Sequence, residues 1–265
     1  MAIRAHRASA VDALPPPSTS FVDPSLRYHW PAHVYARHVD AGAVLLDLKA
    51  NRYFALGEAA ARALSDLVAE DPWAATEENS SAGAASAQAR SAVARGLMEA
   101  QLFQEHSAGT RDFSPAHLHV RGPLYGIDDR ITAPARVRAH HIRHFAWHLW
   151  RARRSLRHSS LQAIAYEVHR ARHGTTVLDA AALDALTTLV TVFRCIRPYS
   201  FTAQDQCLLH ALTLVRFLGS YGFFPSWVIG VRLRPWAAHS WVQQGELLLD
   251  ATPDMVRAYS PIVAI

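Results

Sequence analysis

The sequence has few cysteines, a single lysine and no long apolar run. Cys195 and Cys207 are its only two cysteines, so no disulfide framework is expected, and sparse thiols suit a reducing cytosol. Residues 1–14 lack the apolar core of a signal peptide, and no run of about 18 apolar residues predicts a transmembrane helix. These absences exclude a disulfide-rich secreted domain and a membrane-spanning protein, and we expect a cytoplasmic location.

The composition is otherwise typical of a globular protein. Half of the residues are hydrophobic and 18% are charged, which leaves enough apolar material for a core. A length of 265 residues predicts one or two domains. The formal net charge of +5 is carried almost entirely by arginine, because Lys49 is the only lysine.

Changes in composition divide the chain into four segments. Residues 1–27 contain a Pro-Pro-Pro-Ser-Thr-Ser run and are predicted to be a disordered arm. Residues 28–105 are predicted to form a small domain, residues 106–134 an interdomain linker with scattered Gly, Pro, Asp and His, and residues 135–265 a second domain. The predicted fold class is α+β.

The small domain combines strands with helices. Alternation predicts strands at residues 33–39, 43–48 and 53–56, and helical spacing of apolar residues predicts helices at 58–69 and 87–103. Three short strands followed by helices predict a winged-helix-like α+β module.

The second domain begins with three predicted helices, at residues 135–157, 161–172 and 179–196. A fourth helix follows, because Thr202–Asp205 has the spacing of a capping box and an apolar periodic stretch comes next. Cys207 therefore lies near a helix start, where unpaired backbone N–H groups and the helix dipole favour a thiolate.

A β-hairpin is predicted after this helix, with Gln244-Gly245 as its two-residue turn, because glycine supplies the positive φ such a turn needs. In this register His239 faces Asp250, and cross-strand partners have Cβ atoms about 4.5–5.5 Å apart. Asp250 would then hold the imidazole of His239 toward the Cys207 thiol, which is the papain-like arrangement. The alternative is a buried structural cysteine with a core histidine.

Three further polar residues lie close to Cys207 in the sequence, namely Gln204, Gln206 and His210. Gln204 and Gln206 are candidates to stabilise an oxyanion beside the Cys207 backbone N–H, and the sequence does not choose between them. His210 shares a helix face with Cys207 but has no visible acidic partner, so we interpret it as structural.

The residues around the triad resemble a known family. The matching pieces are Cys207-Leu208, Ile229-Gly230-Val231-Arg232, Pro235-Trp236-Ala237-Ala238-His239-Ser240-Trp241-Val242, Asp250 and Ser260-Pro261-Ile262. They are similar to the lasso-peptide B proteins, with Ala-Ala-His-Ser-Trp-Val as the most specific piece. The resemblance implies a transglutaminase-like, papain-like fold with Cys207, His239 and Asp250 as the triad.

The resemblance also implies a function and a partner. The protein would be a leader peptidase that cleaves a precursor peptide at the leader–core junction, with a Thr next to the last leader position. An ATP-dependent, asparagine-synthetase-like cyclase would then close the freed core N-terminus onto an acidic side chain. No cofactor is implied for the peptidase itself.

The small domain has a resemblance of its own. Leu46-Asp47-Leu48 followed by the segment Arg52–Leu56 and a helix resembles the leader-peptide recognition domains of ribosomal-peptide maturation. In that family the leader adds a strand to the exposed third strand and packs against the last helix, which is β-augmentation. The implied contact residues are Arg52, Tyr53, Phe54 and Leu56 on the strand and Val93 and Leu97 on the helix.

Two alternative functions remain open, a transglutaminase-type acyltransferase and a non-enzymatic winged-helix regulator. A winged helix can bind DNA, but the middle of this module is acidic and its last helix has no basic stripe, so no nucleic-acid partner is expected. A transglutaminase-type acyltransferase would use the same triad with an amine acceptor. A non-enzymatic winged-helix regulator would not use the thiol at all.

The predicted helix at residues 135–157 is rich in arginine. A solvated face is the preferred interpretation over a nucleic-acid patch, and the face can also meet an acidic precursor peptide or a partner enzyme. His140, His144 and His148 have i, i+4, i+8 spacing, but no cysteine or acidic ligand accompanies them, so no metal site is predicted.

Overall fold

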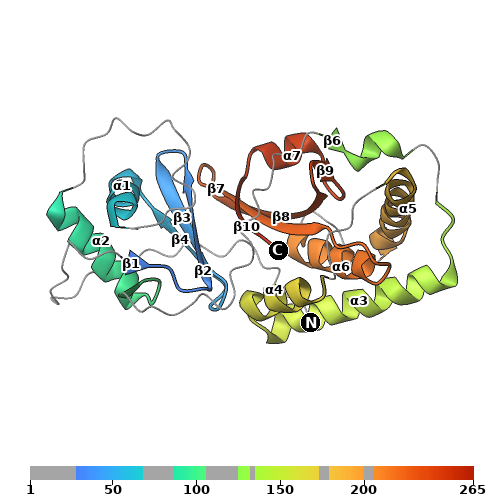
Figure 1. Cartoon of the computed structure of the whole chain (residues 1–265), viewed down its shortest axis with the longest axis horizontal. Coiled ribbons are helices and arrows are strands. Elements are labelled where there is room, and N and C mark those ends of the chain that lie inside the picture. Colours follow the sequence, from blue (N-terminus) through green and yellow to red (C-terminus); the bar gives the residue numbers. More distant parts are fainter. Residues whose placement is uncertain (1–27, 68–85, 106–124, 132–134, 173–178, 200–205) are drawn as a thin grey trace. The chain divides into compact units, whose positions relative to one another are not determined.

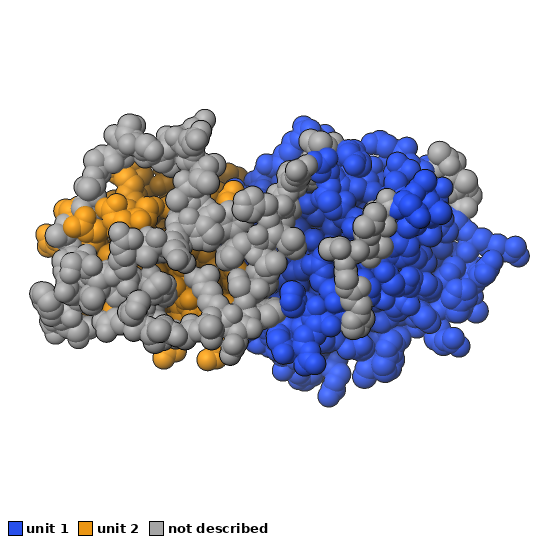
Figure 2. All heavy atoms as spheres, in the orientation of Figure 1, with its two compact units in different colours: residues 1–8, 118–230, 238–265 blue, residues 9–117, 231–237 orange. Residues whose placement is uncertain are grey.

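The computed structural model describes residues 28–67, 86–105, 125–131, 135–172, 179–199 and 206–265 (Figure 1). Backbone contacts group the chain into two units. One contains residues 1–8, 118–230 and 238–265, and the other contains residues 9–117 and 231–237 (Figure 2). The arm predicted at residues 1–27 and most of the predicted linker lie outside the described residues. Helices and strands occur in both units, as the predicted α+β class requires.

The smaller unit contains a three-stranded antiparallel sheet of β2 (Val34–Val39), β3 (Gly42–Asp47) and β4 (Arg52–Leu56). Strand β3 lies in the middle, so β2 and β4 are the two edges among the described residues. Asp47 accepts two backbone N–H groups of the turn after β3, at 2.8 and 2.9 Å, and Asn51 has a positive φ of 57° there. The three strands confirm the predicted succession, and these turn residues explain the tight connection between β3 and β4.

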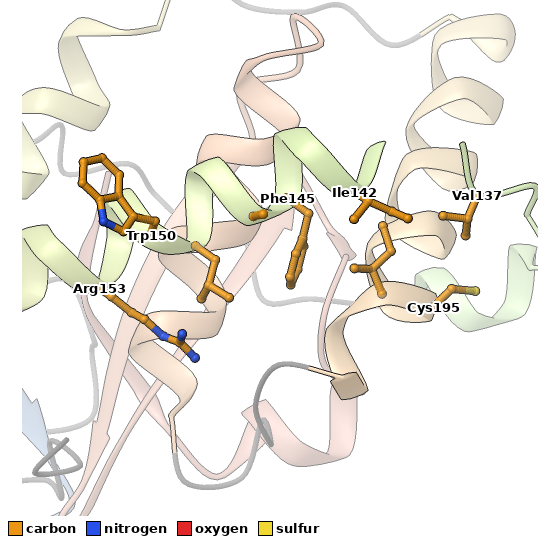
Figure 3. Close-up of a pocket in the computed structure, with 9 residues that line it drawn as sticks. Val137, Ile142, Phe145, Trp150, Arg153 and Cys195 are labelled. Carbon is orange, nitrogen blue, oxygen red and sulfur yellow. The ribbon is translucent and has the colours of Figure 1, made fainter. Parts of the chain in front are cut away.

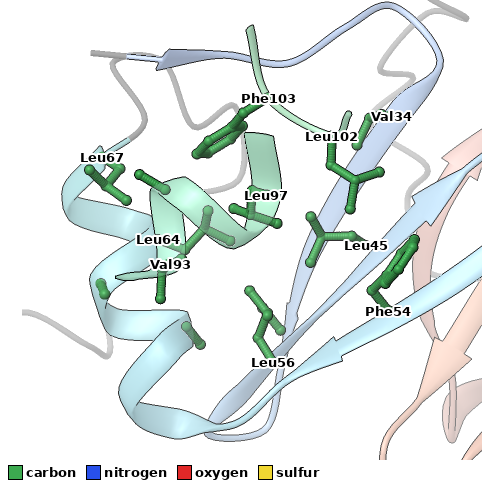
Figure 4. Close-up of a cluster of buried hydrophobic side chains, with 14 residues drawn as sticks. Val34, Leu45, Phe54, Leu56, Leu64, Leu67, Val93, Leu97, Leu102 and Phe103 are labelled. Atoms are coloured by element: carbon green, nitrogen blue, oxygen red, sulfur yellow. The ribbon is translucent and has the colours of Figure 1, made fainter. Parts of the chain in front are cut away.

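Two helices cover one face of this sheet. Helix α1 (Glu58–Leu67) and helix α2 (Ala87–Glu99) pack against each other and enclose a hydrophobic core with the sheet (Figure 4). The Ser86 side chain caps α2 by accepting the Ala89 backbone N–H at 3.2 Å. A separate antiparallel pair joins β1 (Tyr28–His29) to β5 (Gln104–Glu105).

The larger unit is rich in helices. Its helices are η1 (Ile127–Arg130), α3 (Ala139–His158), α4 (Leu161–Arg170), α5 (Ala180–Ile196), η2 (Arg197–Tyr199), α6 (Cys207–Gly219) and α7 (Pro253–Arg257). Helices α3 and α5 pack against α6, whose side chains are buried on nearly all sides, as its mostly apolar sequence requires. None of the described helices combines the length and apolar character needed to cross a bilayer.

The sheet of this unit has five strands among the residues that the structure describes. Their order is β10 (Ser260–Ala264), β7 (Ser226–Arg232), β8 (Ala237–Gln244), β9 (Leu247–Leu248) and β6 (Tyr125–Gly126). Strand β6 pairs in parallel with β9, and η1 follows it directly. Residues 125–130 therefore belong to the fold of this unit and not to the linker, which was predicted at residues 106–134. A two-residue strand is too short to show alternation, which explains why the sequence pattern missed it.

Candidate active site

Cys207 is the first residue of α6 and Gln206 is its N-cap, so the prediction that Cys207 lies near a helix start is confirmed. The first backbone bond of the helix runs from the His210 N–H to the Gln206 carbonyl, at 2.9 Å. The backbone N–H groups of Cys207 and of the two residues after it therefore precede the regular hydrogen-bond ladder. These donors and the positive end of the helix dipole favour negative charge on the sulfur. The predicted capping box at residues 202–205 lies outside the described residues.

The sulfur of Cys207 lies against strand β8. The backbone N–H groups of Ser240 and of Leu208 lie close enough to Sγ to lower the pKa of the thiol. Ser240 directly follows His239 in β8, so this contact brings the thiol beside the strand position that carries the histidine. The start of a buried helix and a central strand of the sheet thus hold the two groups together.

Burial controls the charge of the thiol. It raises the pKa of Cys207 above the ordinary value, and the nearby Asp250 carboxylate also raises it, while the N–H donors of Ser240 and Leu208 lower it. The net effect is a higher pKa, so the thiol is protonated at neutral pH in the resting site.

The His239 ring packs against two aromatic side chains. Its centroid lies 6.1 Å from that of Trp241, with 22° between the planes, and 5.3 Å from that of Tyr259, with 36°. Burial lowers the pKa of His239 below its ordinary value, so the imidazole is neutral at pH 7 and can accept a proton. A neutral thiol beside a neutral imidazole is the resting state that these shifts favour.

The hairpin that carries His239 has a different register from the predicted one. Gln243 lies opposite Leu248, so the turn is Gly245-Glu246, and its glycine has a φ of 59°. The prediction of a turn at Gln244-Gly245 is therefore wrong, although glycine supplies the positive φ in both alternatives.

The corrected register also separates His239 from Asp250. Continued past the end of β9, it places Asp250 opposite Trp241 and diagonal to His239, so the predicted direct pairing is wrong by two residues. An even shift leaves side chains on their original faces, so Asp250 and His239 still belong to one face of the hairpin. Diagonal partners are typically about 7–8 Å apart.

Beyond the end of β9, the side chain of Asp250 provides a hydrogen-bond acceptor for the backbone of β8. Its Oδ1 accepts the Val242 backbone N–H at 2.8 Å, and Arg194 donates to the Leu249 carbonyl at 3.2 Å. The side chain of Asp250 and the guanidinium of Arg194 thus satisfy two backbone groups of the hairpin. No hydrogen bond joins Asp250 to the His239 ring in the part of the chain that the structure describes.

Burial raises the pKa of Asp250 to about 7. The Val242 N–H and the positive charges of Arg194 and Arg197 act in the opposite direction, because they favour the carboxylate. The group is therefore close to half ionised at neutral pH. On the same hairpin face as His239, its charge can stabilise an imidazolium without a direct hydrogen bond.

A cysteine at a helix start, a histidine on the adjacent strand and an aspartate after the next strand follow one another in this order along the chain. Residues 146–264 match the family model of the transglutaminase-like superfamily. The matched segment contains Cys207, His239 and Asp250, and a domain of this kind fits a cysteine peptidase or acyltransferase. No curated protein and no solved structure matched the chain.

The transglutaminase-like domain contains supporting residues that the sequence reasoning missed. Arg194 pairs with Asp128 as well as with the Leu249 carbonyl, so it connects α5 and η1 to the end of the hairpin. Gly230 in β7 lies directly under Trp241: a Cβ there would approach two indole carbons at 2.6 Å. No local sequence pattern indicates these contacts, because each joins elements that are far apart in the chain.

The other polar residues near Cys207 are placed as follows. Gln204 lies outside the described residues, so of the two oxyanion candidates only Gln206 can be examined. Gln206 is the N-cap residue of α6, and its buried Oε1 accepts no hydrogen bond from the described residues. His210 is buried and stacks on Phe193 with centroids 5.5 Å apart, and burial lowers its pKa to about 3. It is a neutral core residue.

The histidines of α3 form a row along one side of the helix. The ring centroids of His140 and His144 are 6.4 Å apart, and so are those of His144 and His148. Burial lowers the pKa of His148 to about 4. Among the described residues, no group of three or more His, Cys, Asp or Glu side chains is arranged to hold a metal ion.

The six residues predicted to contact a leader peptide fall into two groups. On β4, Arg52 is exposed and Tyr53 is half-buried. The remaining four are buried in the core of the smaller unit: Phe54, Leu56, Val93 and Leu97 (Figure 4). Their side chains support the sheet from the inside, so they are not available for direct contact. A peptide can meet only the backbone edge and the outward side chains of β4.

Proposed function

We propose that the protein is the leader peptidase of a lasso-peptide pathway, cleaving a precursor peptide at its leader–core junction. The observation that carries this proposal is the Cys207 sulfur, held at the start of α6 against the Ser240 N–H beside His239. The transglutaminase-like domain supplies the class of chemistry. The resemblance of the sequence around His239 to lasso-peptide B proteins supplies the substrate class.

The neutral resting pair suggests how the reaction starts. His239 takes the proton of the Cys207 thiol as the sulfur attacks the carbonyl carbon of the scissile peptide bond. The tetrahedral oxyanion forms near the backbone N–H groups at the start of α6, which are donors preorganised for negative charge. The imidazolium then gives its proton to the leaving amine of the core peptide, and the C–N bond breaks.

The second half of the reaction regenerates the site. The leader remains joined to Sγ as a thioester, and water attacks this carbonyl while His239 accepts the water proton. The thiolate leaves, recovers its proton from His239, and the leader is released with a free carboxylate. Asp250 stabilises the imidazolium in both halves through its charge. The core peptide leaves with a free amine for the cyclase.

Leader recognition is proposed for β4 in the smaller unit, which would be a winged-helix-like recognition domain. β4 is an edge of its sheet among the described residues, so its outward N–H and C=O groups can pair with an added strand. Exposed Arg52 and half-buried Tyr53 are side chains of β4 that could provide selectivity. The proposed partners are thus the precursor peptide and the ATP-dependent cyclase, in the cytoplasm.

The peptidase proposal predicts a specific product when a competing amine is present. The protein is incubated with its precursor peptide and methylamine, and the products are identified by mass spectrometry. Hydrolysis should yield a leader fragment ending in a carboxylate and a core fragment with a free amine. A transglutaminase-type acyltransferase, which the family match also accommodates, would instead attach methylamine to a glutamine side chain without cutting the backbone. That second outcome would replace the peptidase with the acyltransferase.

Strand addition at β4 predicts a local change in hydrogen exchange. The full chain with Cys207→Ala binds the precursor without cutting it, and amide exchange is compared with and without peptide. Exchange should slow at residues 52–56, because edge N–H groups acquire partners. Strand β2, the other edge of the same sheet, is the internal control and should not change. Protection of β2 alone, or of neither edge, would reject β4 as the recognition strand.

A further inference from the structure

Helix α3 exposes large apolar side chains on the face that points away from the core. Ile142, Trp147 and Trp150 are 51%, 55% and 53% exposed, and the two indoles stack with centroids 5.1 Å apart. The core-facing side of α3 packs Phe145 against Phe193, with ring centroids 5.2 Å apart. A single exposed apolar residue is ordinary, but a cluster of them indicates a binding surface.

Two of these side chains, Ile142 and Trp150, border a groove between α3 and α5. The groove has a volume of about 710 Å³, and Ile142, Leu149 and Trp150 line it from α3 while Cys195 and Ile196 line it from α5. Figure 3 shows Trp150 and Arg153 toward one end and Val137 and Cys195 toward the other. We call this surface the α3 groove. Neither Cys207 nor His239 lines it, so it is separate from the proposed catalytic centre.

The charge of the outer face of α3 has one sign. No Asp or Glu occurs between Arg136 and His158. At 100° per residue, Arg143, Arg153, Arg154 and Arg157 fall on the same outward half of the helix as Ile142 and the two tryptophans. Arg151, also on α3, faces α4, where it pairs with Glu167. Tryptophan and arginine side chains thus lie together on α3, a helix whose own residues include no Asp or Glu.

We propose that the α3 groove binds an acidic amphipathic helix of a partner protein. The concave apolar lining fits side chains spaced i, i+3, i+4 and i+7 on such a helix, and carboxylates on its flanks would meet the arginines. A membrane surface is flat and would leave a groove of this depth unfilled. Single-stranded nucleic acid would use the arginines and stack on the tryptophans, but it has no aliphatic groups to place against Ile142, Leu149 and Ile196.

Binding is tested on the full chain with Cys207→Ala, which keeps the groove and removes proteolysis. The probe is a fluorescein-labelled helical peptide with leucines at i, i+3, i+4 and i+7 and glutamates at the flanking positions, measured by fluorescence anisotropy. Ile142→Glu should weaken binding about tenfold or more, because it places a carboxylate at the rim of the groove. Met255→Glu is the matched control: Met255 is 54% exposed but lies on α7, and its substitution should leave the affinity unchanged.

Two further arms decide the chemistry of the partner. Arg153→Gln should weaken binding of the acidic peptide and reduce its dependence on salt, because Arg153 is an arginine that lines the groove. A peptide with lysine in place of glutamate should bind at least about tenfold more weakly than the acidic one. Failure of the acidic peptide to bind, or equal effects of Ile142→Glu and Met255→Glu, would overturn the proposal. Tighter binding of an RNA oligonucleotide or of anionic vesicles, with loss on Ile142→Glu, would assign the groove to those ligands instead.

Discussion

Replacing Cys207 by alanine is expected to abolish cleavage of the precursor, by about 10³-fold or more, whereas Cys195→Ala should leave the rate within about twofold. The reason is position. Cys207 begins α6 and its sulfur lies near the Ser240 N–H beside His239, while Cys195 is an exposed residue near the end of α5. Cleavage is followed by chromatography of the leader fragment, with circular dichroism to confirm that both variants are folded.

A chemical experiment separates the two thiols further. Cys195 is exposed, so iodoacetamide should alkylate it first, and the half-buried Cys207 with its raised pKa should react slowly without substrate. In a Cys195→Ala background, any loss of activity on alkylation then belongs to Cys207. Equal losses from the two alanine variants would mean that both thiols are structural, and the proposed nucleophile would be wrong.

Helices and strands were predictable from the sequence where their patterns are local. A helix that begins close to Cys207 and the three strands between Val34 and Leu56 depend on apolar spacing and turn residues, which the sequence shows directly. The order of Cys207, His239 and Asp250 along the chain is likewise visible in the sequence alone.

The register of the hairpin was not predictable in the same way. A single glycine at Gly245 satisfies a turn at either of two positions, and an even shift keeps every side chain on its face. Two hydrogen bonds just beyond the paired strands support the observed register. The Asp250 carboxylate accepts the Val242 N–H, and Arg194 donates to the Leu249 carbonyl. Burial of Val93 and Leu97 in the smaller unit likewise depends on how its helices pack on the sheet.

Asp250→Asn should lower kcat/KM by about 10²–10⁴-fold, because an amide cannot stabilise the imidazolium of His239. The asparagine side-chain oxygen can still accept the Val242 N–H, so the end of the hairpin should be retained. Because the pKa of Asp250 is about 7, kcat/KM of the natural protein should rise between pH 6 and 8 as the carboxylate forms. This rise should be absent in the variant. Asp254→Asn is the control: Asp254 is an exposed residue of α7 that pairs with Arg257, and its substitution should change little.

The same substitution should stabilise the protein at alkaline pH while it reduces activity. Burial raises the pKa of Asp250 from 3.8 to about 7, so the folded state holds this proton more tightly than the unfolded state does. Its contribution to stability is therefore fully present below pH 4 and is lost as the pH rises through about 7. Each pKa unit corresponds to about 1.4 kcal/mol, so Asp250→Asn should gain on the order of 2–4 kcal/mol relative to the natural protein between pH 4 and pH 8.

Urea unfolding of both proteins at the two pH values measures this double difference, in which the titration of every other group cancels. A gain in stability at pH 8 together with a loss of activity would identify Asp250 as a buried carboxylate retained for its charge during catalysis. Two results would count against that role. Full activity in Asp250→Asn would remove Asp250 from the mechanism, and an unchanged double difference would mean that its pKa is not raised by burial.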